Sequence, residues 1–228
     1  MSFIVIEGLD GSGKSTQLKY LRNYFDREGI DFFFMHFPRT EAPIFGEMIA
    51  RFLRGDLGKI EEVDPYLVAL LYAGDRMDAA DIIRSEQKKK KLVLVDRYVY
   101  SNIAFQCAKL KDSAGQEKLR NWILHMEYEH FRIPRPDLNL FLDVPFSFTA
   151  ANLSEKREGR ERDYLAGQQD IHEKDLQFQQ RVRDVYLHLT ASQPDCISIP
   201  CYTPDETMLA EDKIFGKILN ALKDKKIL

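Results

Sequence analysis

Cysteine is scarce in this sequence, and its placement suggests no site. The 228 residues include three cysteines, Cys107, Cys196 and Cys201, whose spacing fits no metal-binding pattern. A cysteine-ligated metal centre is therefore not expected. Reduced thiols in a cytoplasmic protein are the expected state of so few cysteines.

Long apolar runs, internal repeats and a strong net charge are also missing. No apolar stretch approaches the roughly 20 residues that a membrane helix needs, so we expect no membrane partner. The N-terminus enters a strand and a loop motif at once, which argues against a secretory signal peptide. A net charge of -3 argues against a general nucleic-acid binder, so no nucleic-acid partner is expected.

What the sequence does contain is a phosphate-binding loop at residues 8–16. The stretch GLDGSGKST fits G-x-x-x-x-G-K-[ST], follows an apolar run at 3–7 and precedes a helical pattern at 17–25. Its glycines let backbone N–H groups approach an anion, and the helix start adds unpaired donors. We therefore expect ATP to bind the whole loop, which comprises Gly8, Leu9, Asp10, Gly11, Ser12, Gly13, Lys14, Ser15 and Thr16.

Four residues of the loop and of the later stretch at 96–97 have the side chains expected for phosphate and Mg²⁺ binding. Lys14 is predicted to reach the β- and γ-phosphates, and Ser15 to offer its hydroxyl to Mg²⁺. Asp96 ends an apolar strand, as a Walker-B-type Mg²⁺ acid does, although an acid there can also satisfy a helix N-terminus. Arg97 beside it suits either a phosphate fork or a structural ion pair.

Strand-like and helix-like segments alternate along the chain. Strands are predicted at 3–7, 31–36, 92–95, 138–144 and 196–199. Helices are predicted at 17–25, 43–53, from 64 onward, and at 101–110, 115–131, 147–153, 171–189 and 204–222. This order predicts one three-layer α/β/α domain over residues 1–228, with a five-stranded parallel sheet and helices on both faces. Ligands of such folds bind beyond the carboxyl ends of the strands.

Three motifs behind the loop carry a family resemblance. Phe37-Pro38-Arg39, the run at 70–76 and the run at 96–106 resemble, in order and spacing, the substrate-side motifs of thymidylate kinases. The resemblance is most specific from residue 3 to about 144 and continues to about 186. It implies a P-loop kinase fold, transfer of the ATP γ-phosphoryl group to dTMP to give dTDP and ADP, Mg²⁺ dependence, and a homodimer.

The resemblance also implies roles for single residues. Asp10 takes the place of the loop acid that contacts the sugar or metal, and Arg39 that of an arginine at the acceptor phosphate. Tyr72 stands where an aromatic ring stacks on thymine, and Arg97 where an arginine bridges the phosphates. Arg76 and Asn102 stand where polar groups read the thymine edge, Ser101 where the pocket wall lies, and Phe105 where an aromatic packs near the sugar C2′. The remaining acceptor-site residues are Phe37, Pro38 and Glu173.

Two departures from the family pattern concern the donor nucleotide. The loop has Gly11 and Ser12 where some members carry an arginine, whereas the lid-like segment 154–170 contains Arg157, Arg160 and Arg162. We therefore predict that a lid arginine, with Arg160 favoured, joins Asp10, Lys14 and Arg97 in catalysis. The family's adenine-stacking arginine is also missing, because that region reads Ala151-Asn152-Leu153.

Two other functions share the phosphate loop. A deoxynucleoside kinase of the thymidine type requires a general base at the end of the second or third strand, where this chain has arginines instead. A P-loop NTPase switch of the GTPase kind carries an N-K-x-D motif, which is absent. Both alternatives are therefore less well supported than a monophosphate kinase.

Overall fold

The computed structural model describes residues 2–60, 62–89, 91–154, 160–165, 167, 170–173 and 175–228, with backbone alone at 154 and 160–162. Within these residues, five parallel strands form one sheet: β1 (Phe3–Gly8), β2 (Phe32–His36), β3 (Leu92–Asp96), β4 (Leu138–Asp143) and β5 (Cys196–Pro200). The strand order is β2-β3-β1-β4-β5. The predicted fold class is confirmed, and strand ends match the prediction within about two residues.

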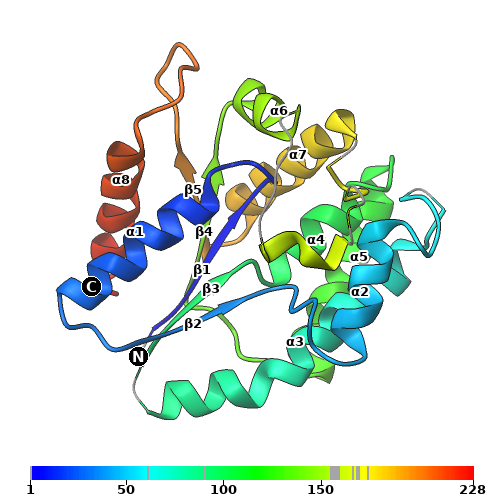
Figure 1. Ribbon diagram of the computed structural model, residues 1–228, viewed down its shortest axis with the longest axis horizontal. Helices are drawn as coiled ribbons and strands as arrows, with labels where there is room; N and C mark the ends of the chain where they lie inside the picture. The colour runs from blue at the N-terminus through cyan, green and yellow to red at the C-terminus, as the bar shows by residue number, and fades with distance from the viewer. Residues whose placement is uncertain are drawn as a thin grey trace.

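Helices cover both faces of the sheet (Figure 1). They are α1 (Lys14–Arg27), α2 (Phe45–Arg54), α3 (Pro65–Lys88), α4 (Val99–Cys107), α5 (Ser113–Leu124), α6 (Phe146–Ser154), α7 (Leu176–Ser192) and α8 (Glu211–Asp224), with a π-helix η1 (His125–His130) and a 3₁₀ helix η2 (Arg160–Leu165). No helix in the described part of the chain is both long and apolar enough to cross a membrane.

Alternation along β1 divides the core into two layers. Ile4 and Ile6 join the apolar cluster under α1 and α8, while Phe3 and Val5 join the cluster under α2, α3, α4, α5 and α7. All six residues of β1 are buried, as expected for a central parallel strand covered on both faces. This burial fixes the carboxyl end of β1, and the phosphate loop that follows it, at the middle of the sheet.

Two helix starts differ from the sequence prediction by five residues or more. The helix predicted from residue 171 begins at Leu176, because the Asp175 side chain accepts a hydrogen bond from the Phe178 N–H at 3.0 Å and caps it. Glu173 therefore does not cap this helix. The helix predicted from residue 204 begins at Glu211, because residues 202–208 close a turn through an isolated antiparallel bridge.

The helix predicted at 115–131 consists of two parts. α5 covers Ser113–Leu124, and the π-helix η1 continues to His130. The wider turn buries Glu127, which is fully inaccessible to solvent and contacts the candidate site from below. The helix predicted at 101–110 runs instead over Val99–Cys107.

The lid prediction falls mostly outside the described residues. Arg157 lies in a range that the structure does not describe, and Arg160 and Arg162 are described only as backbone positions in η2. Their predicted contact with the donor phosphate is not tested by the structure.

Candidate functional site

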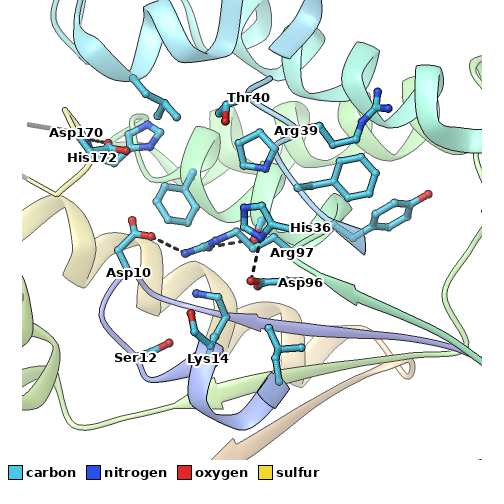
Figure 2. Close-up of a pocket in the computed structure, with 18 of the residues that line it drawn as sticks. Asp10, Ser12, Lys14, His36, Arg39, Thr40, Asp96, Arg97, Asp170 and His172 are labelled. Carbon is cyan, nitrogen blue, oxygen red and sulfur yellow. Dashed lines mark hydrogen bonds and ion pairs between the residues drawn. The ribbon is translucent and has the colours of Figure 1, made fainter. Parts of the chain in front are cut away.

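A cleft of about 820 Å³ opens at the carboxyl ends of β1, β2 and β3 (Figure 2). Most predicted site residues line it: Asp10, Gly11, Ser12, Gly13, Lys14, Ser15, Phe37, Pro38, Arg39, Tyr72, Arg76, Asp96, Arg97, Ser101, Asn102, Phe105 and Glu173. Gly8, Leu9 and Thr16 belong to the loop but do not line the cleft. The fold thus gathers residues from five separate stretches around one space.

The phosphate loop has the backbone conformation that an anion site needs. Gly11 and Gly13 have φ values of 73° and 80°, in the left-handed region that favours glycine. Gly13 is the N-cap of α1, and no side chain caps that helix. The first N–H groups of α1 are therefore available to a phosphate.

Lys14 reaches across this loop. Its Nζ donates to the backbone oxygen of Leu9 at 3.1 Å, and it is 8% exposed. Burial lowers the pKa of Lys14 to about 8, with the charge of Arg97 adding to the effect and the carboxylates of Asp96 and Asp10 opposing it. A bound phosphate would favour the charged form of Lys14, since opposite charges stabilise one another.

Arg97 joins the phosphate loop to the acceptor side of the cleft. Its Nη2 donates to Asp10 Oδ1 at 2.6 Å and its Nη1 to the Gly8 backbone oxygen at 2.8 Å. The second oxygen of Asp10 accepts from Gln179 Nε2 at 3.1 Å. Burial alone would raise the pKa of Asp10, but the charges of Arg97 and Lys14 lower it to about 2. The ion-pair interpretation of Arg97 is therefore correct, and its phosphate contact stays a prediction.

Glu7 holds the start of α4, and with it Arg97, in place. Its Oε1 accepts from the backbone N–H groups of Tyr98 at 3.0 Å and Ser101 at 3.2 Å. Its Oε2 accepts from the hydroxyls of Ser101 and Tyr186. Glu7, rather than Asp96, is therefore the acid that satisfies this helix N-terminus. Arg97 has a φ of 63°, which is uncommon for a residue other than glycine, so its backbone conformation is strained.

Asp96 ends β3 with one oxygen partnered and one not. Its Oδ2 lies 3.0 Å from His36 Nδ1. Its Oδ1 is buried and has no hydrogen-bond partner in the described part of the chain. Burial alone would raise the pKa of Asp96, but the hydrogen bond to His36 and the charge of Lys14 lower it. An ionised carboxylate with a free oxygen beside the phosphate loop fits a Mg²⁺ site.

At the far end of the cleft, Arg76 and Asn102 share one buried acid. Arg76 Nε and Nη2 donate to the two oxygens of Glu127 at 2.6 and 2.7 Å. Asn102 Nδ2 donates to Glu127 Oε1 and to the Ala69 backbone oxygen, both at 3.0 Å. The Oδ1 atom of Asn102 is buried without a partner among the described residues. Both side chains are thus fixed from behind and line the cleft on their other side.

Two aromatic rings also line that end of the cleft. Phe105 is 7% exposed and packs on His172, with ring centroids 5.0 Å apart. The Arg97 guanidinium lies over the Phe105 ring at 5.2 Å from its centroid. Tyr72 is half-buried in α3 and lines the same space.

Arg39 lines the cleft but is already partnered. Its backbone N–H and Nε donate to the Asp75 carboxylate at 2.9 and 2.8 Å, and its Nη2 donates to Asp78 Oδ2 at 2.6 Å. Asp75 is 1% exposed, so the carboxylate that accepts from Arg39 is buried in the protein interior. Contact with an acceptor phosphate stays a prediction for Arg39, and Asp75 is a supporting residue that the sequence did not reveal.

The region near the missing adenine-stacking arginine has its own contacts. Asn152 Nδ2 donates to the Gly11 backbone oxygen at 2.7 Å, which joins the end of α6 to the phosphate loop. Behind it, Asp143 accepts from Arg183 Nε at 2.8 Å and from the Tyr202 hydroxyl at 3.0 Å. Residues 151–153 carry no charged side chain, so this segment offers no cation to a donor base.

The turn at 170–173 forms a wall of the cleft. Of its residues, only Glu173 was assigned to the site from the sequence. Asp170 accepts from the Tyr164 hydroxyl at 3.0 Å and from the His172 N–H at 2.8 Å. Burial raises the pKa of Asp170 to about 7, and the charges of Asp10 and Glu173 add to this. Burial also lowers the pKa of His172 to about 3. The wall therefore contains a neutral imidazole and a carboxyl that titrates near neutrality.

Comparison with known proteins decides the family. The family model described as thymidylate kinase matches residues 6–211 of this chain. The chain belongs to the thymidylate kinase family. This membership identifies the reaction as ATP-dependent phosphorylation of dTMP to dTDP, and it rejects the nucleoside kinase and NTPase switch alternatives.

Individual relatives agree with the family model. The chain is 32% identical to a thymidylate kinase of Mycobacterium tuberculosis over 188 residues, which cover 82% of this chain and 85% of that protein. It is 31% identical to a probable thymidylate kinase of Methanocaldococcus jannaschii over 222 residues, covering 97% and 96%. A solved thymidylate kinase structure from Candida albicans has the same fold, with a TM-score of 0.67, 24% identity, and coverage of 99% of this chain and 92% of that one.

Proposed function

We propose that the cleft holds dTMP and ATP end to end, with the transferred phosphoryl group between Lys14 and Arg97. The observation that carries this proposal is the placement of Arg97, whose guanidinium contacts the phosphate loop at Gly8 and packs on Phe105 at the acceptor end. A group in that position neutralises both phosphate chains at once.

The acceptor base is assigned to the space lined by Tyr72, Arg76, Asn102 and Phe105. A tyrosine ring provides a stacking face. The cleft-facing sides of Arg76 and Asn102 supply polar groups for the base edge, since Glu127 already fixes their other sides. Phe37, Pro38, Ser101 and Glu173 are assigned to the surrounding wall, and Asp10 and Arg39 to the sugar and acceptor phosphate.

Transfer at this site depends on positioning and charge rather than on a covalent intermediate. The phosphoryl group passes in line from donor to acceptor oxygen, and cations offset the charge on its equatorial oxygens. Lys14 and Arg97 supply two such cations at fixed positions. Ser15 and Asp96 would hold Mg²⁺, which would neutralise charge on the β- and γ-phosphates when bound. We assign Arg160 of the proposed lid segment 154–170 as a further cation at the γ-phosphate.

The test is a panel of acceptors assayed with ATP and Mg²⁺ by release of ADP. We expect the highest kcat/KM for dTMP, a lower value for dUMP by about 10- to 200-fold because only a methyl group differs, and little activity with thymidine. Faster reaction with AMP, CMP or GMP would contradict the base assignment. Faster reaction with thymidine than with dTMP would contradict the placement of the acceptor phosphate at Arg39 and Arg97.

We also propose a homodimer formed through α3. This helix carries apolar side chains that are exposed in the single chain, including Leu67 at 61%, Leu70 at 41% and Met77 at 39%. These three lie on one side of the helix, because their spacing of three and seven residues follows the helical repeat. A second copy would remove this surface from water.

Sedimentation of the Leu70→Glu variant tests the dimer. We expect it to sediment as a monomer, whereas Leu176→Glu, which changes an equally exposed leucine on α7, should sediment like the unaltered protein. Equal sedimentation of both variants and the parent would contradict the α3 interface.

Residues 1–228 are proposed to act as a single domain in the cytoplasm, where the three buried free thiols would stay reduced.

A further inference from the structure

The adjacent ends of β2 and β3 carry an imidazole and a carboxylate that meet at the rim of the cleft. His36 and Asp96 are direct partners in the parallel register of the two strands. Neighbouring strands lie about 4.8 Å apart, so side chains at paired positions contact each other on the same face. Figure 2 shows the two side chains joined by a dashed line beside Arg97. The function assigned above does not use His36.

The hydrogen bond between them joins His36 Nδ1 and Asp96 Oδ2 at 3.0 Å. A carboxylate oxygen accepts, so Nδ1 is the donor in this contact. His36 is 52% exposed at its side chain, whereas that of Asp96 is 10% exposed. The imidazole thus covers the carboxylate on its solvent side.

This contact decides which oxygen of Asp96 stays free. Among the hydrogen bonds that the structure describes, the one with His36 is the only one made by the Asp96 carboxylate. Lys14 and Arg97 act on Asp96 through charge but donate to other atoms. Without His36 the carboxylate would be free to turn about its terminal bond, because such torsions are broad.

A buried carboxylate oxygen without a partner is costly, because it has lost its hydrogen bonds to water without a replacement. The Oδ1 atom of Asp96 is in this condition, and Asp96 lines the same cleft as Lys14 and Ser15. A ligand that donates to Oδ1, such as a water molecule of a hydrated Mg²⁺, would remove that cost. The free oxygen is useful to such a ligand only while its orientation is fixed.

We propose that His36 is a positioning residue that holds Asp96 in the orientation required by Mg²⁺ on the donor nucleotide. The hydrogen bond from Nδ1 occupies Oδ2 and leaves Oδ1 as the oxygen without a partner in the described part of the chain. This proposal rests on the assignment of Asp96 to the metal under the proposed function. It adds a supporting group behind the residue that faces the metal, a type of contact whose loss commonly costs 10- to 100-fold in metal affinity or activity.

The test compares three substitutions at His36 by calorimetric binding of ATP, once with Mg²⁺ and once with a chelator. In His36→Asn, the amide nitrogen occupies about the place of Nδ1, so the variant keeps the donor. His36→Gln places its amide farther out, and His36→Ala has no donor. No acceptor nucleotide is added, so the readout does not depend on the dTMP assignment.

We expect His36→Ala and His36→Gln to bind MgATP about 10-fold more weakly while binding metal-free ATP as tightly as the unaltered protein. His36→Asn should recover most of the MgATP affinity. A merely electrostatic or structural role for His36 would change both affinities together. Unchanged MgATP affinity in His36→Ala, an equal loss for both forms of ATP, or an Asn variant as defective as the Ala variant would each overturn the proposal.

Asp96→Asn separates a failure of this proposal from a failure of the metal assignment. If Asp96→Asn loses the preference for MgATP and His36→Ala keeps it, only the positioning role of His36 is overturned. If Asp96→Asn keeps the preference, the assignment of Asp96 to Mg²⁺ is wrong and the proposal falls with it. Urea unfolding of each variant confirms that binding is measured on folded protein.

Discussion

Replacing Arg97 with alanine should separate the structural role of this arginine from its role in turnover. Arg97 pairs with Asp10 through a 2.6 Å contact, and it also donates to the Gly8 carbonyl at 2.8 Å. Removing one partner of a fully buried pair costs about 3–5 kcal/mol. The Asp10 side chain is 22% exposed, so solvent reduces this, and we expect a loss of about 2 kcal/mol in the free energy of unfolding.

The expected loss of turnover is larger than this loss of stability. A positioned donor that stabilises transition-state charge contributes about 10²- to 10³-fold in kcat, and an arginine at a transferring phosphoryl group can contribute more. We therefore expect kcat of Arg97→Ala to fall about 10³-fold, which corresponds to about 4 kcal/mol. The kcat of Arg97→Lys should lie between that of the unaltered protein and that of Arg97→Ala, because an ammonium keeps the charge but cannot contact Asp10 and Gly8 as a fork.

The double variant Asp10→Asn/Arg97→Ala is the decisive comparison. An amide at position 10 needs no counter-charge, so the double variant should regain most of the stability that Arg97→Ala loses. Its turnover should stay low, since the cation at the phosphate is still missing. The assays are urea unfolding and steady-state ADP release for all four proteins. Normal turnover in Arg97→Ala, or turnover restored together with stability in the double variant, would refute the assignment of Arg97 to the phosphates.

Three further predictions concern the acceptor base, the cleft wall and the lid. Tyr72→Ala should raise KM for dTMP by about 5- to 150-fold, since stacking contributes about 1–3 kcal/mol per base, while Tyr72→Phe should stay close to normal; steady-state kinetics with varied dTMP checks both. Asp170 has a pKa raised from 3.8 to about 7, so the folded protein binds its proton more tightly and stability falls as pH rises between these values. Asp170→Asn should therefore gain up to about 4 kcal/mol over the unaltered protein at pH 8 and little at pH 4; a gain in urea midpoint that does not change with pH would contradict this. Arg160→Ala should lower kcat by a larger factor than the factor by which it changes KM for ATP. An unchanged kcat would remove this arginine from the proposed mechanism.

The sequence by itself determined the architecture and one end of the site. Strand ends follow from short apolar runs, and the phosphate loop follows from a contiguous motif, because both depend on neighbours in the chain. The residues proposed for the acceptor site, from Phe37 to Phe105, were found through motifs that resemble those of one family, and they line the cleft. Helix starts were less certain, since capping by Asp175 and the turn before Glu211 depend on which of several polar residues is used.

Only the tertiary structure decided which charges meet. Arg97 pairs with Asp10 over 87 positions in the sequence, His36 with Asp96 over 60, and Arg76 with Glu127 over 51. No local pattern marks such pairs, because ion pairing depends on distance in space and any of many carboxylates could serve. The parallel sheet brings the ends of β1, β2 and β3 to one edge, and burial there leaves each charge only the partner that the fold places beside it.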